Sequence, residues 1–219
     1  MFLISEKSPI ALTSEHHARI DAMWKTFTAW RSVTVNDTLC RFLREEAGQI
    51  TVAHDVTYKD VVGLRFKRHA QEAFTPPFQV LSAIALVYTA DDLLILLERD
   101  SGDWGKSLEC SGGFIRAKYM ETEPFNADTF IGERVREDLE LPEQVHLHCS
   151  YLGHYDAQSI LEHMLVYCVT LSVDAAELMR LKTKAIVLPE EYTPREHEEH
   201  TKLPLHKPSR AVLERFHTK

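Results

Sequence analysis

The sequence predicts an α/β protein in which a mixed sheet is covered by helices and preceded by a helical and β extension. Two long apolar runs, 78–89 and 93–100, are typical of strands that are covered on both faces. A Gly-Gly turn and an acidic helix follow these runs. Pro76 and Pro77 interrupt regular structure, so we place the boundary between an extension, 1–75, and a core domain, 76–219, at this point.

The extension is expected to begin with two helices within 14–48. The first has apolar residues at helical spacing after a candidate N-cap at Ser14 or Thr13. The second, over 36–48, repeats that pattern and ends at Gly48. The next segment, 49–66, alternates apolar and polar residues in two short runs, which predicts a strand or hairpin that feeds the main sheet.

The core domain continues with short, well-separated elements. A short strand at 108–110, a sharp turn at 111–113 and a helix over 127–141 are predicted first. Further strands are expected at 145–156, 162–173 and 186–189, a short helix at 174–185, a surface loop at 189–208 and an amphipathic C-terminal helix at 207–216.

Composition and targeting signals limit the function classes. The formal net charge of −8 argues against nucleic acid as a general partner, because that class needs a basic surface. Four widely spaced cysteines without a CxxC pair argue against zinc knuckles and indicate reduced thiols in a cytoplasmic protein. The N-terminus has no signal-peptide pattern, and no stretch approaches the roughly 20 apolar residues that span a bilayer. We therefore expect a cytoplasmic protein without a membrane partner.

The strongest motif combines the glycine turn with the acidic helix. The order of elements over 78–188 resembles the Nudix hydrolase family, whose motif runs G-x5-E-x7-R-E-U-x-E-E-x-G-U, with U a bulky aliphatic residue. "SLECSGGFI" (107–115) is similar to the strand and turn of that family, and "ERVREDLEL" (133–141) falls on R-E-U-x-E-E-x-G-U. In this register Glu137 and Asp138 take the paired acids and Val135 takes the internal aliphatic position.

The match departs from the motif at three places. The R-E pair is inverted to Glu133-Arg134, and Glu140 replaces the glycine. The segment between turn and helix is about six residues longer, so Glu121 or Glu123 corresponds only loosely to the first glutamate. A second register would use Arg136 and Glu137 as the R-E pair, but it puts an acid at an aliphatic position and is rejected. Glu137 falls on an acidic position of the motif in both registers.

The residue types suit a hard cation bound to a diphosphate. Mg²⁺ prefers oxygen ligands and bridges to phosphates, and carboxylates at i, i+3 and i+4 share one helix face. A Gly-Gly turn lets the backbone approach a metal or a diphosphate closely. The expected ligands of Mg²⁺ (or Mn²⁺) are Glu133, Glu137, Asp138 and the carbonyl oxygen of Gly112.

The resemblance also implies a reaction and a substrate class. "DVTYKDVVGLR" (55–65) is similar to a segment of UDP-sugar diphosphatase-type members, which implies a nucleoside diphosphate derivative such as a nucleotide sugar. Glu137 and Glu162 are the candidate catalytic acids, and Arg99 and Gly113 the candidate substrate contacts. For Glu162 an ordinary loop glutamate, and for Arg99 a structural ion pair, is an equally good interpretation.

Three hypotheses follow for function. The leading one is a metal-dependent hydrolase that cleaves the diphosphate linkage. The alternative is a catalytically degenerate module that binds a nucleotide or a protein, because Arg134 places a cation where the motif has a metal-binding glutamate. The third is a sensor or regulatory partner in which the N-terminal helices form the surface of a homodimer.

Overall fold

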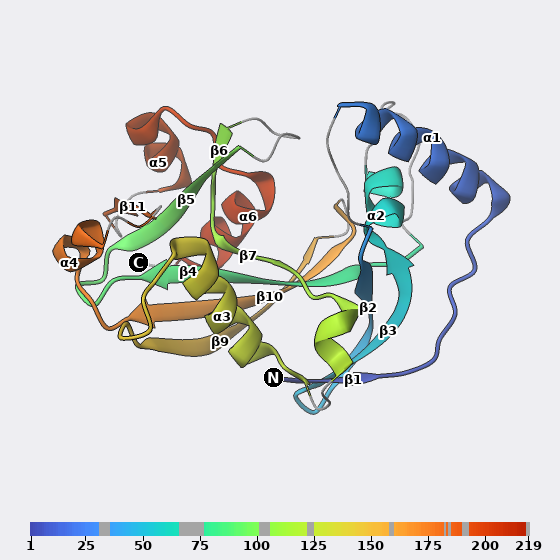
Figure 1. The fold of residues 1–219 in the computed structure, drawn as a ribbon, viewed down its shortest axis with the longest axis horizontal. Coiled ribbons are helices and arrows are strands. Elements are labelled where there is room, and N and C mark those ends of the chain that lie inside the picture. The colour runs from blue at the N-terminus through green and yellow to red at the C-terminus, as the bar shows by residue number, and fades with distance from the viewer. Residues whose placement is uncertain are drawn as a thin grey trace. The chain divides into compact units, whose positions relative to one another are not determined.

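The computed structural model describes residues 1–30, 36–65, 77–100, 106–121, 125–157, 160–181, 183, 185–189 and 193–217. Over these residues the protein is α/β, with eleven strands of a mixed sheet, six α-helices and one 3-10 helix (Figure 1). The chain divides into two compact units. Unit 1 comprises Met1–Ser82, Phe114–Asn126 and Asp156–Met164, and unit 2 comprises Ala83–Gly113, Ala127–Tyr155 and Leu165–Lys219.

The strands of unit 1 pair in the order β8-β1-β3-β2. Their bounds are β1 Phe2–Ser5, β2 Thr38–Glu46, β3 Gln49–Thr57 and β8 Phe125–Asn126. β1 is parallel to β3, whereas β1 with β8 and β2 with β3 are antiparallel. β2 and β3 form a hairpin whose turn residues, Ala47 and Gly48, both have positive φ (50° and 76°), as a tight hairpin turn with right-handed strand twist requires.

The prediction of a helix over 36–48 is wrong, because this segment is the strand β2. Register shifts between Leu39 and Arg41 and between Phe42 and Arg44 interrupt the two-residue alternation along β2. Such bulges remove the strand signature from the sequence and leave apolar residues at spacings that resemble a helix. Gly48 ends the segment as expected, but it does so as a hairpin residue.

The helices of unit 1 are α1 (Ser14–Trp30), α2 (Tyr58–Arg65) and the 3-10 helix η1 (Ala117–Glu121). α1 is confirmed, and its candidate cap is resolved in favour of Thr13, whose Oγ1 accepts a hydrogen bond from the N–H of His16 at 3.2 Å. Of the segment 49–66, for which a strand or hairpin is predicted, residues 49–57 form the strand β3 and residues 58–65 form the helix α2, while residue 66 lies outside the described residues.

Unit 2 contains a sheet in which the strands pair in the order β11-β5-β4. In addition, β10 pairs with β4 and β9, β6 pairs with β5, and β7 pairs with β4. The strand bounds are β4 Val80–Tyr88, β5 Leu94–Asp100, β6 Lys106–Glu109, β7 Ser111–Phe114, β9 Leu147–Ala157, β10 Glu162–Leu171 and β11 Ala185–Leu188. β4, β7, β9 and β10 also have residues in unit 1. All residues of β4 but Tyr88 are buried, which confirms the interpretation of 78–89 as a covered strand.

The helices of unit 2 are α3 (Ala127–Leu139), α4 (Ala175–Arg180), α5 (Pro194–Thr201) and α6 (Lys207–Phe216). In Figure 1, α3 lies in front of β9 and β10. Its apolar face is buried through Phe130, Ile131, Val135 and Leu139, as its spacing predicts. Within the described ranges no helix has both the length and the apolar character that crossing a bilayer needs.

Two predictions for unit 2 are corrected. Residues 111–113 form part of the strand β7 and not a free turn. The expected loop over 189–208 contains α5, which starts with a capping box between Thr193 and Glu196 and buries His197. Half of its eight residues are charged, and it lacks the apolar stripe by which sequence periodicity identifies helices.

Candidate functional site

The site is built where β7 passes the end of α3, and Gly112 makes this approach possible. Gly112 has φ +154°, and a Cβ atom there would lie 2.3 Å from the carbonyl oxygen of Ala83 in β4. No side chain fits in that space, which explains the glycine. The motif therefore marks a place where the backbones of β7 and β4 come close, which the missing side chain of glycine permits.

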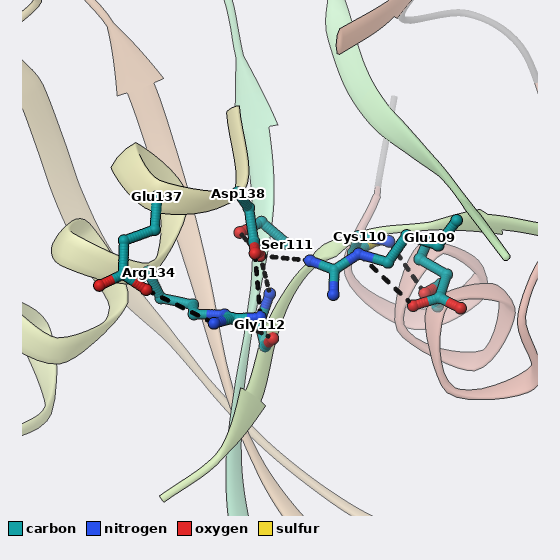
Figure 2. A network of polar contacts seen from close by, with 9 residues as sticks. Glu109, Cys110, Ser111, Gly112, Arg134, Glu137 and Asp138 are labelled. Atoms are coloured by element: carbon teal, nitrogen blue, oxygen red, sulfur yellow. Dashed lines mark hydrogen bonds and ion pairs between the residues drawn. The ribbon is translucent and has the colours of Figure 1, made fainter. Parts of the chain in front are cut away.

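Asp138, in the last turn of α3, is the buried centre of the site. Its side chain is 7% exposed, and its Oδ2 accepts hydrogen bonds from Ser111 Oγ at 2.8 Å and from the N–H of Gly112 at 3.4 Å (Figure 2). The same carboxylate pairs with Arg99 Nη2 at 2.5 Å and with Arg134 Nη2 at 2.9 Å. Asp138 thus satisfies both oxygens within the protein, as a buried carboxylate must.

Arg134 contacts three of the four predicted metal ligands. Its Nε donates to the carbonyl oxygen of Gly112 at 3.2 Å, its Nη1 lies 3.5 Å from Glu137 Oε2, and its Nη2 lies 2.9 Å from Asp138 Oδ1. Figure 2 shows the guanidinium between the glycine backbone and the two helix acids. The cation among these oxygens is therefore a side chain of the chain itself.

Arg99 reaches the same carboxylate from β5. Besides Asp138, its Nε lies 3.8 Å from Glu109 Oε2, and Ser107 Oγ donates to Glu109 Oε1 at 3.2 Å. Arg99 and Arg134 are each 30% exposed. The ion-pair interpretation of Arg99 is confirmed, and its contact with a substrate stays a prediction.

Glu140, which stands where the motif has glycine, follows α3 directly and has φ +55°. This left-handed conformation is the one in which helices commonly end on glycine. The backbone therefore keeps the conformation that the motif glycine would suit, although the residue has changed.

Two candidate residues of the helix lie apart from the cluster. Glu133 is exposed, and within the described residues it forms no hydrogen bond or ion pair. Arg136, which starts the rejected register, donates to the carbonyl oxygens of Pro142 at 2.6 Å and Val145 at 2.7 Å. It holds the chain after α3. Glu123 lies outside the described residues, and Glu121 is an exposed residue of η1 in unit 1.

Glu162 belongs to unit 1 and is the first residue of β10, not part of a loop. It is 7% exposed, pairs with Arg65 of α2, and accepts a hydrogen bond from Ser82 Oγ at 2.8 Å. These contacts give the carboxylate a structural role in joining α2 to β10. Its catalytic role stays a prediction.

Three residues that contact the cluster are not predicted from the sequence: Ser111, Glu109 and Arg134. The motif assigns no role to Ser111 or Glu109, and Arg134 enters it only as a departure. A usable signal was present, because Arg134 is spaced i+3 from Glu137 and i+4 from Asp138, the spacings at which opposite charges meet on a helix. The hydrogen bond from Ser111 had no such signal, since it joins residues 27 positions apart.

The residues as arranged do not fit a divalent cation. Mg²⁺ requires free oxygen lone pairs in near-octahedral geometry. Here Gly112, Glu137 and Asp138 all face the guanidinium of Arg134, and Asp138 also carries Arg99. A metal placed among these oxygens would displace or repel two positive charges.

Comparisons with known proteins leave the family open. No protein-family model matches the chain, and no curated protein matches it. Among solved structures it is similar to the DR0079 protein from Deinococcus radiodurans, at 11% identity over 83% of this chain and 98% of that chain, with a TM-score of 0.43. A likeness at this level carries no functional argument.

Proposed function

We propose that the chain is a Nudix-like module that binds a nucleoside diphosphate derivative through arginine side chains and without a divalent metal. One observation carries the proposal: the guanidinium of Arg134 lies among the oxygens of Gly112, Glu137 and Asp138, which the motif would assign to a metal. The contacts of Arg134 therefore support recognition of a ligand better than metal-assisted hydrolysis.

Two guanidinium groups meet on one carboxylate in this cluster. Arg99 binds Oδ2 of Asp138 and Arg134 binds Oδ1, so the buried acid fixes both side chains while each stays 30% exposed. Guanidinium forks bind phosphate oxygens in a bidentate manner, and a fixed fork loses less entropy on binding than a mobile one. A diphosphate is the ligand that would engage two adjacent forks.

Glu137 would be the contact that a ligand replaces. Its side chain is 72% exposed, and its only described contact in the cluster is the 3.5 Å approach to Arg134. A phosphate oxygen can take this place, because a contact of that length and exposure contributes little. Mg²⁺ would compete with the arginines for the same phosphate oxygens, so added Mg²⁺ is expected to weaken binding.

Isothermal titration in EDTA with UDP-glucose and ADP-ribose tests the proposal. We expect the wild type to bind at least one of them without metal. Arg99→Gln should weaken that binding about tenfold or more, since a charged hydrogen bond contributes roughly 1.5–3 kcal/mol. Lys106→Gln is the matched control, because Lys106 is an exposed cation of β6 that pairs with Glu98 and lies outside the cluster. Equal loss in both variants, or no binding in EDTA, would contradict the proposal.

A metal-dependent diphosphate hydrolase is the second candidate, and one observation favours it. Asp138 lies against the N–H of Gly112, so the helix acid and the glycine backbone meet as the motif predicts. This candidate requires that metal and substrate together displace Arg134. It predicts two monophosphate products from a nucleotide sugar when Mg²⁺ or Mn²⁺ is added, and loss of those products in Glu137→Gln.

A further inference from the structure

We infer that Arg134 is a built-in cation that replaces a divalent metal in this cluster, so that one substitution, Arg134→Glu, converts the cluster into a Mn²⁺ site. The inference deepens the proposed function by naming the residue that makes the module independent of metal. Its test uses metal alone, so it stands or falls separately from nucleotide binding.

The contacts of Arg134 have the pattern expected of a resident cation. Three different nitrogens of one guanidinium contact three oxygen donors: the carbonyl of Gly112 in β7 and the carboxylates of Glu137 and Asp138 in α3. A carbonyl and two carboxylates around one positive charge form an oxygen set of the kind that hard divalent ions take. The guanidinium joins strand to helix, as a bound ion would.

The negative charge of Glu137 and Asp138 favours a second cation beside Arg99. Asp138 is 7% exposed, so its carboxylate needs charge compensation from inside the protein. Removing Arg134 would leave Arg99 as the only described cation on Asp138 and would remove the hydrogen bond that Arg134 donates to the Gly112 carbonyl. Without Arg134, a metal ion from solution is favoured at the place that the guanidinium occupies in the wild type.

The helical spacing shows why glutamate at position 134 would complete a site. Position 134 lies i−3 and i−4 from Glu137 and Asp138, so a carboxylate there shares the face on which both acids lie. Together with the carbonyl of Gly112 it would bring four protein ligands within one face of α3 and the adjacent strand. Arg134→Gln provides the matched control, because it removes the positive charge without adding a carboxylate.

The experiment measures Mn²⁺ binding by loss of the free-ion electron paramagnetic resonance signal, and thermal unfolding with and without Mn²⁺, in the absence of nucleotide. We expect no saturable binding and no shift in Tm for the wild type at millimolar Mn²⁺. Arg134→Gln should show a rise in Tm at millimolar Mn²⁺, and Arg134→Glu the same rise at a Mn²⁺ concentration at least tenfold lower.

Several results would overturn the inference. Saturable Mn²⁺ binding by the wild type that Glu137→Gln weakens would show that Arg134 does not exclude the metal. Cooperatively unfolding Arg134→Glu protein without Mn²⁺ binding would show that the oxygens are not arranged for an ion. If Arg134→Glu does not fold, Arg134→Gln decides: the absence of any Tm response to Mn²⁺ in that variant contradicts the inference.

Discussion

Asp138→Asn probes the carboxylate that holds Arg99, Arg134 and Ser111 in the cluster. The substitution keeps the shape of the side chain and removes its charge. Asp138 is 7% exposed and binds Arg99 at 2.5 Å, Arg134 at 2.9 Å and Ser111 Oγ at 2.8 Å. Two guanidinium groups would lose their shared counter-charge, and one carboxylate oxygen would become an amide nitrogen that cannot accept their hydrogen bonds.

The expected cost follows from burial. Removing one partner of a fully buried ion pair costs about 3–5 kcal/mol. Both arginines are 30% exposed, so water compensates part of the freed positive charge and we expect a loss of about 2–3 kcal/mol. This is a large fraction of the roughly 5–15 kcal/mol by which a typical domain is stable.

Urea unfolding at neutral pH measures the loss, with the free energy of unfolding extrapolated linearly and the slope m unchanged. Glu137→Gln is the matched control on the adjacent residue. Its side chain is 72% exposed and makes one 3.5 Å contact in the cluster, so it should change stability by less than about 0.5 kcal/mol. If Asp138→Asn costs no more than Glu137→Gln, the buried carboxylate does not organise the cluster and the reasoning is refuted.

Three further predictions concern single positions. Gly112→Ala should cost about 2 kcal/mol or more or abolish folding, since its Cβ would clash with the β4 backbone. Gly113→Ala should be close to neutral, because the nearest atom to its Cβ would be Nε of Arg134 at 3.9 Å, and equal melting temperatures for the two variants would contradict this prediction. Glu140→Gly should stabilise the protein by about 0.5–1 kcal/mol, because it relieves a left-handed φ at the end of α3, and a lower urea midpoint would contradict it. Burial lowers the pKa of His197 to about 4. The unfolded chain then binds the proton more tightly, so folding stability falls by about 3 kcal/mol as the pH drops from about 6.5 to about 4. His197→Leu should remove that part of the pH dependence in urea titrations, and an unchanged pH dependence would count against it.

The elements that sequence reasoning found are those with a local signal. The apolar runs of β4 and β5 and the apolar stripe of α3 are confirmed, because burial on both faces of a strand or on one face of a helix leaves a regular pattern. β2 was missed because its bulges break that pattern, and α5 because a charged helix has no stripe. β2 is held by its pairing with the next strand, β3, and α5 starts with the capping box of Thr193 and Glu196.

The sequence predicts which residues of the candidate site lie together, but it does not predict how their charges are compensated. Gly112, Glu137, Asp138 and Arg99 do lie together, as the order of turn, helix and strand predicts. The part that could not be predicted is how charge is compensated there. Arg134 contacts Gly112 only because β7 lies next to α3. This is a tertiary contact, and the spacing of residues along the sequence gives no signal for it.

The effect of Mg²⁺ on ligand affinity tests the central claim most directly. Titrating the wild type with UDP-glucose and ADP-ribose in EDTA, and again in excess Mg²⁺ with the products analysed afterwards, gives the sign of that effect in one experiment. The arginine cluster predicts binding in EDTA, weaker binding in Mg²⁺ and an intact ligand. Binding that appears only with Mg²⁺, accompanied by release of two monophosphates, would contradict the claim.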